Sequence, residues 1–355
     1  MRACAAVAPR PVLVAPDSFK GTHSAARVAA AVVQGLETAG VPAEACPVAD
    51  GGEGTLAVLL PALGGETRGT RAHDPLGRER AAGFALLEGG GTALLEVAEA
   101  SGLALVEAPG PSTAWAASSR GTGELILAAV AEGAQVVVVG AGGSATTDGG
   151  AGALEAIADG GGLRGAQLVV LCDVTVAWEA CAATFAPQKG ADQATVARLA
   201  KRLDALAARL PRDPRGVPGA GAAGGLAGGL WAAHDAVLEP GAAWVLDALD
   251  FDGRLAGAAA LVVGEGRLDD QSLQGKIVGE LARRARASAV ACHAIVGSLP
   301  TPGVPAQRAQ EVGQSGWNPP GWAAGFASVR VASTLEELER AGAQLARELH
   351  PSAEG

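Results

Sequence analysis

Acidic residues follow several short apolar runs of this sequence, always together with glycine, serine, threonine or lysine. The pattern occurs in five segments: 16–22, 50–55, 140–150, 172–173 and 264–269. Carboxylates are ligands that Mg²⁺ prefers, and glycine-rich loops leave backbone N–H groups free to bind anions. The combination is typical of magnesium-assisted phosphoryl transfer.

Lysine residues add a second signal. The chain contains four lysines, and three of them, Lys20, Lys189 and Lys276, stand directly beside a glycine. A compact ammonium group on a flexible backbone is suited to contact with a phosphate. Taken singly, each feature has a simpler explanation: the acids could cap helices, the glycines could form turns and the lysines could be solvated. The hypothesis therefore depends on the three features occurring at the same places.

The elements that would position these groups alternate between strands and helices. Short valine-rich runs without polar alternation predict buried parallel strands at 11–15, 135–139, 168–171, 260–263 and 289–296. A shorter run at Cys46–Ala49 also precedes an acid. Helical patterns begin at Ser24, at Asp192 and at a capping box of Thr334 and Glu337. The alternation predicts an α/β fold, in which ligands bind at the carboxyl ends of the strands.

One region interrupts this alternation. Residues 69–106 contain strand-like pieces at Phe84–Leu87 and Ala93–Val97 between glycine-containing turns, which indicates antiparallel structure. We therefore predict two domains. Residues 1–65 with 256–355 form a discontinuous Rossmann-like domain with a parallel sheet, and residues 66–255 form a mixed α/β domain. The segment 298–325, rich in Gly, Pro and Trp, is expected to be a long surface loop.

Composition excludes several classes of protein. The 355 residues include 37 Asp and Glu against 27 Lys and Arg, a net charge of −10, and no basic cluster for nucleic acid. No apolar run approaches the roughly 20 residues of a membrane span. The five cysteines are scattered without a C-x-x-C pair, so we expect buried reduced thiols in a cytoplasmic protein rather than disulfides or zinc. The sequence leaves open whether the chain forms a homo-oligomer.

Two nucleotide-binding motifs need separate consideration. There is no P-loop, because Gly275-Lys276 continues with Ile277 and lacks the earlier glycine. The segment 140–145 matches the G-x-G-x-x-A dinucleotide pattern, with Asp173 as a possible ribose-binding acid. Asp173 follows 28 residues after Ala145 instead of roughly 20. An NAD-binding dehydrogenase is therefore a weaker alternative to the kinase, and a ligand-binding protein without activity would not need to keep all the acids.

Nine segments, in order between residues 11 and 297, resemble motifs of the bacterial glycerate kinase family, type I. They are APDSFKGT (15–22), VADGGEGT (48–55), DPLG (74–77), EASGL (99–103), SSRGTGEL (118–125), GGSATTDGGAG (142–152), FAPQKGA (185–191), GAGAAGG (219–225) and GEGRLDDQS (264–272). The resemblance implies a kinase that phosphorylates D-glycerate with ATP and Mg²⁺, mostly to 2-phosphoglycerate. It also implies two α/β domains with the active site in the cleft between them. A kinase of another small hydroxy acid is the nearest alternative.

The resemblance also implies roles for individual residues. The catalytic candidates are Lys20, Asp50, Asp148 and Lys189, with Asp148 as the base for the hydroxyl proton and Lys189 neutralising the transferred group. The candidates for binding substrate and phosphate are Asp17, Ser18, Gly51, Gly52, Glu53, Gly142, Gly143, Ser144, Glu265, Arg267 and Asp269. Asp50 and Glu53 are the candidate Mg²⁺ ligands. Thr147 stands where the family usually has asparagine, which bears on the choice of acceptor.

Overall fold

The chain divides into two compact units. The computed structural model describes residues 9–268, 276–299 and 325–349. The terminal unit comprises Met1–Ala49 with Asp250–Gly355, and the central unit comprises Asp50–Leu249. The boundaries predicted from the sequence, at 65/66 and 255/256, lie sixteen and six residues later. The difference concerns α2 (Thr55–Leu63), which belongs to the central unit, and most of α11 (Phe251–Gly257), which belongs to the terminal unit.

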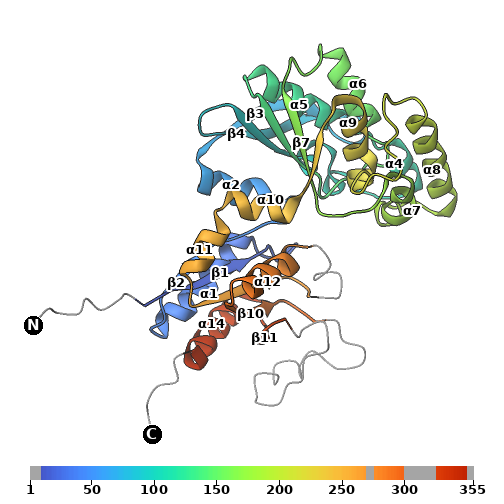
Figure 1. Ribbon diagram of the computed structural model, residues 1–355. Helices are drawn as coiled ribbons and strands as arrows, with labels where there is room; N and C mark the ends of the chain where they lie inside the picture. Colours follow the sequence, from blue (N-terminus) through green and yellow to red (C-terminus); the bar gives the residue numbers. More distant parts are fainter. Residues whose placement is uncertain (1–8, 269–275, 300–324, 350–355) are drawn as a thin grey trace, which may run out of the picture. The chain divides into compact units, whose positions relative to one another are not determined.

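The terminal unit is built on a parallel five-stranded sheet (Figure 1). Its strands are β1 (Val12–Pro16), β2 (Ala43–Ala45), β9 (Ala260–Glu265), β10 (Ala291–Val296) and β11 (Ser328–Val331). The spatial order β2-β1-β9-β10-β11 is the doubly wound order 2-1-3-4-5, in which ligands bind where the direction of winding reverses. In this unit the reversal lies between β1 and β9.

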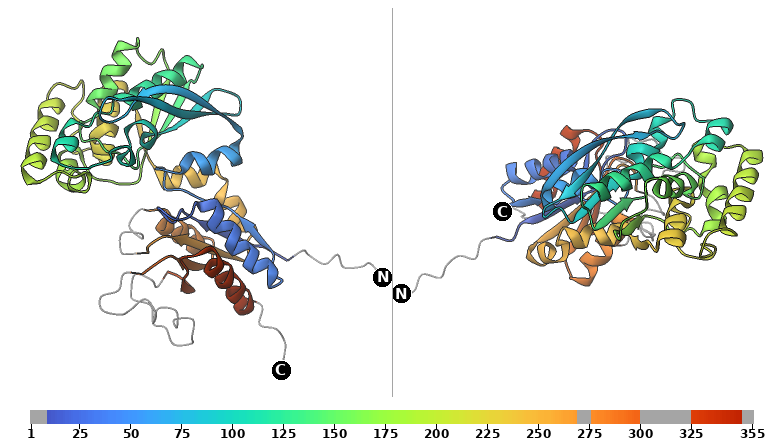
Figure 2. Two further views of the ribbon diagram at one scale, coloured as in Figure 1. Left: turned by 180° about the vertical axis from the view of Figure 1, so that it is seen from behind. Right: turned by 90° about the horizontal axis from the view of Figure 1, so that it is seen from above.

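Helices cover both faces of this sheet. Helix α1 (Ala25–Thr38) and helix α14 (Leu335–Leu349) lie side by side on one face and share a core with it (Figure 2). Their approach requires glycine, because a Cβ on Gly35 would lie 1.9 Å from the carbonyl oxygen of Glu339. Helix α12 (Ile277–Ala287) packs against β9 and β10 on the other face of the sheet. Alternate residues of these strands point toward that face. The Rossmann-like character predicted for this part of the chain follows from this arrangement.

The central unit is built on a mixed six-stranded sheet in the order β3-β4-β5-β6-β7-β8. Its strands are β3 (Gly65–His73), β4 (Glu79–Leu87), β5 (Thr92–Glu96), β6 (Val136–Gly140), β7 (Gln167–Cys172) and β8 (Val237–Pro240). Strands β3, β4 and β5 pair antiparallel, which confirms the prediction for this region, and β5 to β8 pair parallel. The carboxyl ends of β5 to β8 therefore meet at one edge of the sheet.

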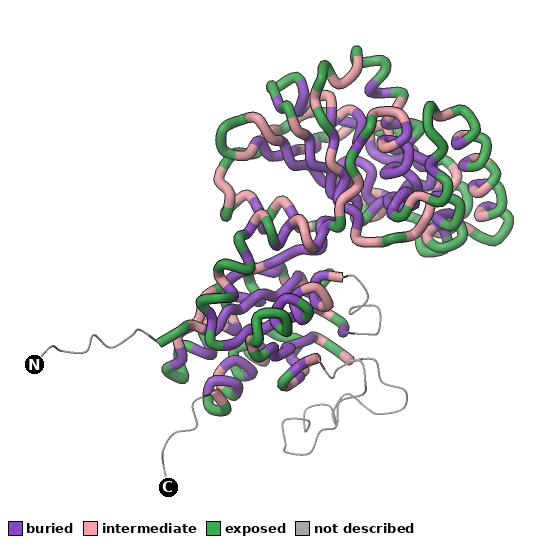
Figure 3. Tube along the Cα trace, in the orientation of Figure 1, coloured by how far each residue is buried: buried purple, intermediate pink, exposed green. Residues whose placement is uncertain are grey.

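The helices of the central unit surround this sheet, whose strands β5, β6 and β7 are largely buried (Figure 3). They are α2, α3 (Val97–Ser101), α4 (Pro111–Ala116), α5 (Arg120–Ala131), α6 (Ala151–Asp159), α7 (Cys181–Phe185), α8 (Gln193–Ala207), α9 (Leu226–His234) and α10 (Gly241–Ala248). Short 3₁₀ turns occur at Leu103–Leu105, Trp178–Ala180, Pro187–Lys189 and Ala222–Gly225. The predicted helix starts at Ser24 and Asp192 are confirmed, since both side chains cap a backbone N–H of the helix that follows.

The apolar run Cys46–Ala49, which precedes Asp50, is not part of a strand. The strand of this region is β2 at Ala43–Ala45. The run nevertheless continues beside β1: the N–H of Cys46 donates to Val14 O at 2.8 Å and that of Val48 to Pro16 O at 3.0 Å. Pro47 between them has no N–H to donate. The loop predicted at 298–325 lies almost wholly outside the described residues.

The burial predicted for the cysteines is confirmed for the described part of the chain. Cys46, Cys172, Cys181 and Cys292 are free and buried. Burial raises the pKa of the Cys172 thiol to about 12, as expected for an inert thiol that packs as a small apolar group. The cytoplasmic location inferred from these thiols stays a prediction. Within the described ranges, no helix is both long and apolar enough to cross a membrane.

Candidate active site

The terminal unit brings five of its predicted site residues to the reversal of its sheet. They are Asp17, Ser18, Lys20, Glu265 and Arg267. Glu265 is the last residue of β9, and the other four lie in the loops that follow β1 and β9. These loops are in contact: the N–H of Asp17 donates to Gly264 O at 2.8 Å, and a Cβ on Gly266 would lie 3.3 Å from Phe19 Cα. The Asp17 carboxylate is buried and accepts a hydrogen bond from Ser18 N at 2.6 Å. Asp269, the sixth candidate, lies outside the described residues.

The central unit brings a second group together through contact between two glycine-rich loops. A Cβ on Gly142 would lie 2.7 Å from Gly52 Cα, and a Cβ on Gly140 would lie 2.8 Å from Gly51 O. Gly51 also has a φ of +90°, a conformation that side chains disfavour. The loop 50–54 therefore lies directly against the loop 140–144 at the carboxyl end of β6. This contact places the carboxylate-bearing loop beside the predicted phosphate loop.

The loop 142–146 presents backbone donors. Among the described residues, none accepts a hydrogen bond from the backbone N–H of Gly142, Gly143 or Ser144. The opposite face of the loop is fixed, because Gly143 O accepts from Leu103 N at 2.8 Å and the Ala145 N–H donates to Ser101 O at 2.9 Å. A loop held in this way has N–H groups available for an anion. The observation supports the predicted phosphate-binding role.

Asp148 is a structural centre of this loop. Its Oδ2 accepts hydrogen bonds from Ser119 N at 2.9 Å, Ser119 Oγ at 2.8 Å and Gly152 N at 3.2 Å. Its Oδ1 accepts from Gly150 N at 3.1 Å, and the residue is 5% exposed. Both oxygens are thus engaged by donors at the start of α5 and α6. This geometry favours a positioning role over the role of catalytic base that the resemblance suggested.

Lys189 is buried in the same region. Its Nζ donates a hydrogen bond to Thr146 O at 2.6 Å, and burial lowers its pKa to about 8. Cys181 and Asp148 act in the opposite direction on this pKa by favouring the charged form. An ammonium group bound to a loop carbonyl stabilises the loop, so contact with a transferred phosphoryl group would be a second role.

Glu96 is a buried acid that the sequence analysis did not single out. It ends β5, and its Oε1 accepts from Gly54 N at 3.1 Å and from Leu56 N at 2.7 Å, at the start of α2. It thus fixes the end of the loop 50–54, where α2 begins. Its pKa is raised, mainly by burial, despite these hydrogen bonds. The available signal was its place directly after the apolar run Ala93–Leu95.

Replacement of Glu96 by glutamine is expected to remove one pH-dependent part of the stability. An acid whose pKa is raised by folding contributes most at low pH, and this contribution is lost as pH rises above its ordinary value of 4.5 and through the folded value. The loss amounts to about 1.4 kcal/mol for each unit between the two values. Glutamine retains Oε1 as the acceptor for both N–H groups, so we expect a flatter profile.

Chemical denaturation between pH 4 and 9 would measure this effect. Glu107→Gln is the matched control, because its side chain is 88% exposed. The explanation would be wrong if the wild-type chain and Glu96→Gln lost stability in parallel over this range.

The carboxylates fit a magnesium site that is completed by substrate. Among the described residues, no group of three or more His, Cys, Asp or Glu is arranged to hold a metal ion. Mg²⁺ in kinases is usually held by one or two carboxylates together with substrate phosphates. Asp50 and Glu53, on the loop beside Gly142 and Gly143, meet this requirement in donor type and number.

The dinucleotide alternative does not agree with the structure. In the dinucleotide fingerprint the glycine loop opens directly into a helix, whose N-terminus binds the pyrophosphate. Here the segment 140–145 is followed by further loop, and α6 begins only at Ala151 with Gly150 as its N-cap. The match at 140–145 is therefore not a Rossmann fingerprint.

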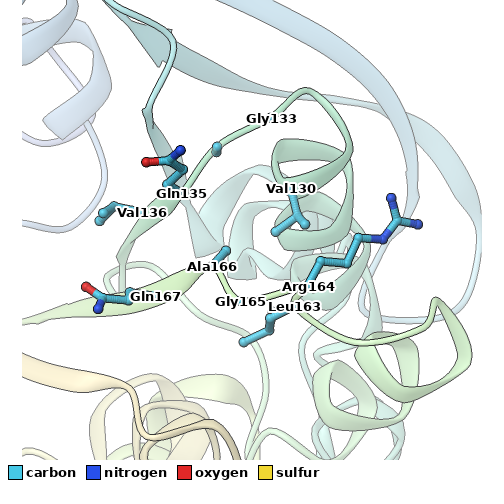
Figure 4. Close-up of a pocket in the computed structure, with 10 residues that line it drawn as sticks. Val130, Gly133, Gln135, Val136, Leu163, Arg164, Gly165, Ala166 and Gln167 are labelled. Atoms are coloured by element: carbon cyan, nitrogen blue, oxygen red, sulfur yellow. The ribbon is translucent and has the colours of Figure 1, made fainter.

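A cavity of about 590 Å³ lies elsewhere in the central unit, at the amino ends of β6 and β7 (Figure 4). Its lining includes Gln135, Val136, Leu163, Arg164 and Gln167. None of the predicted site residues lines it. The chemistry of the candidate site therefore does not involve this cavity.

Comparisons with known proteins were made for the whole chain. The model of the glycerate kinase family matches residues 12–159 and 161–350. An uncharacterised protein of Mycobacterium bovis is 44% identical over 307 residues, covering 81% of this chain and 79% of its own length. Glycerate 2-kinase of Escherichia coli K12 is 36% identical over 325 residues, covering 81% and 85%. A solved structure from Salmonella typhimurium LT2, provisionally named glycerate kinase 2, has a TM-score of 0.76 at 30% identity and covers 96% and 98%.

Proposed function

The chain belongs to the glycerate kinase family, and from this premise we propose that it transfers the terminal phosphoryl group of ATP to D-glycerate, giving 2-phosphoglycerate. One observation carries the proposal. The loop that bears Asp50 and Glu53 lies against the loop whose N–H groups at Gly142, Gly143 and Ser144 have no acceptor among the described residues. Carboxylates and free N–H donors in contact are what a metal-bound phosphate requires.

Each group of residues has a role in this proposal. The N–H groups of Gly142, Gly143 and Ser144 bind phosphate oxygens, and Asp50 and Glu53 would hold Mg²⁺. The ion, when bound, neutralises charge that develops on the phosphate oxygens. In the terminal unit, Ser18 and Lys20 bind a phosphate or the glycerate carboxylate. Further substrate contacts come from the remaining candidates, Asp17, Gly51, Gly52, Glu265 and Arg267.

Coupled detection of ADP release would test the proposal. The assay contains ATP, Mg²⁺ and D-glycerate, with L-glycerate, no acceptor and no metal as controls, and phosphorus NMR identifies the product. We expect turnover only with D-glycerate and Mg²⁺, and a signal from a phosphate on the 2-hydroxyl. Turnover with another hydroxy acid instead would show a different acceptor. ADP release no faster than in the absence of acceptor would contradict the proposed activity.

A further inference from the structure

Two consecutive carbonyl groups in the loop before α6 are each bound by a cation. Lys189 Nζ donates to Thr146 O at 2.6 Å, and Arg202 Nη2 donates to Thr147 O at 2.7 Å. Arg202, on α8, also donates from Nη1 to Trp115 O at 2.9 Å. The Arg202 side chain thus connects α8 to α4 and to the loop. Neither Arg202 nor Trp115 is among the predicted site residues.

These contacts fix the direction of the two N–H groups that follow. In a planar trans peptide, the N–H points away from the C=O of the same unit, and no described peptide bond is cis. The N–H groups of Thr147 and Asp148 therefore point away from the two cations. No acceptor for either N–H exists among the described residues. The Asp148 carboxylate cannot serve, because it is engaged by Ser119, Gly150 and Gly152.

Unpaired N–H groups are uncommon at buried positions. Thr147 is 1% exposed and Asp148 is 5% exposed. A buried N–H without a partner costs free energy comparable to a lost hydrogen bond, so such groups usually bind water or a ligand. A cation at the carbonyl end of each peptide polarises it further, which strengthens its N–H as a donor to a negative charge.

We propose that the N–H groups of Thr147 and Asp148 together bind an anionic oxygen of the substrate, and that Arg202 is the positioning residue that orients them. The inference rests on the proposed kinase function and adds a donor pair to it, next to the predicted N–H groups of Gly142, Gly143 and Ser144. The oxygen belongs to a carboxylate or a phosphate, which present the same chemistry to an N–H pair. The glycerate carboxylate and the phosphates of ATP are thus distinguished by experiment.

Arg198 provides a matched control on the same helix. Its guanidinium lies 4.1 Å from the centre of the Trp115 ring, and that of Arg202 lies 4.7 Å from it. Arg198 is exposed, and its side chain makes no hydrogen bond with the described residues. Replacement of Arg198 therefore removes a cation–π contact and leaves both loop carbonyls bound.

The test compares Arg202→Gln, Arg202→Lys and Arg198→Gln with the wild-type chain. We expect Arg202→Gln to lower kcat/KM by about 100-fold, as for a catalytic geometry displaced by about 1 Å, and to speed deuterium exchange in 144–150. Arg202→Lys keeps the charge and one donor, so it should recover about tenfold of the loss. Arg198→Gln should stay within about twofold of wild type. The KM that rises, for D-glycerate or for ATP, identifies the bound oxygen.

Two kinetic outcomes would overturn the inference, and a third, from a binding experiment, is given below. The first is an Arg202→Gln chain with wild-type melting temperature and both kcat/KM values within about twofold of wild type. The second is an equal loss in Arg198→Gln, which would assign the effect to ring stacking. If Arg202→Gln does not fold, Arg202→Lys decides in its place by the same criteria, with about a tenfold loss expected.

A separate readout covers failure of the proposed function itself. If the wild-type chain shows no turnover, calorimetric titration with inorganic phosphate replaces the kinetic assay. Binding by the wild-type chain that is at least about tenfold tighter than by Arg202→Gln would support the donor pair. Equal binding by the two chains, or no binding by either, would be the third outcome against it.

Discussion

Replacement of Asp148 by asparagine is expected to lower the free energy of unfolding by about 3 kcal/mol, the cost of weakening or losing several buried hydrogen bonds to a charged group. The carboxylate accepts four hydrogen bonds, two of them from Ser119 and the others from Gly150 and Gly152. An amide has one oxygen, so its NH₂ group would face at least one of these N–H donors. The start of α5, the start of α6 or both would therefore lose part of their anchor.

Urea denaturation at pH 7 would measure this loss. Asp192→Asn is the matched control, because Asp192 is an exposed N-cap of α8 and asparagine caps helices as well as aspartate does. The same experiment separates the two roles of Asp148. If Asp148 acts only as the catalytic base, the Asp148→Asn chain should have nearly normal stability and no activity. If its hydrogen bonds hold the loop, the free energy of unfolding should fall. Normal stability together with loss of activity would support the assignment as base.

Much of the fold could be predicted from the sequence, because buried parallel strands require continuous apolar runs. The runs at 135–139 and 260–263 correspond to β6 and β9 within a few residues. Strands β2, β8 and β11 were not predicted, and β3 was covered only by the antiparallel region predicted at 69–106. Strands β2 and β8 have three and four residues, none of their residues is fully buried, and β8 begins with an exposed valine, Val237. Such strands are defined by their neighbours in the sheet and carry no apolar pattern of their own.

The candidate site could be predicted in its residue types and less so in its contacts. Asp50, Glu53 and the glycines at 142–143 were selected as candidates because acids and glycines at strand ends form a local pattern. Glu96 and Arg202 were missed, since their partners are backbone groups 40 to 87 positions away in the chain. A hydrogen bond to a backbone N–H or C=O imposes no residue type on the partner, so no pattern in the sequence indicates it.

The contact between the two glycine-rich loops gives the second large expected effect. A Cβ on Gly142 would lie 2.7 Å from Gly52 Cα and 3.0 Å from Glu53 N, and these backbone atoms cannot rotate out of the way. Gly142→Ala must therefore separate the loop of Asp50 and Glu53 from the phosphate loop. We expect kcat/KM for D-glycerate to fall by about 100-fold or more, because catalytic groups displaced by about 1 Å lose that much.

The stability of Gly142→Ala should fall by less than that of Asp148→Asn, by about 1 to 3 kcal/mol, as for other overpacked sites. Gly69→Ala in β3 is the control, because its Cβ would meet no atom within 4 Å. Steady-state kinetics and melting temperatures of both variants would separate the effect on the site from the effect on the fold. A Gly142→Ala chain with kcat/KM within about twofold of wild type would mean that catalysis does not depend on the two loops lying in contact. The carboxylates and the N–H groups would then act at separate places, and the single observation that carries the proposed function would lose its meaning.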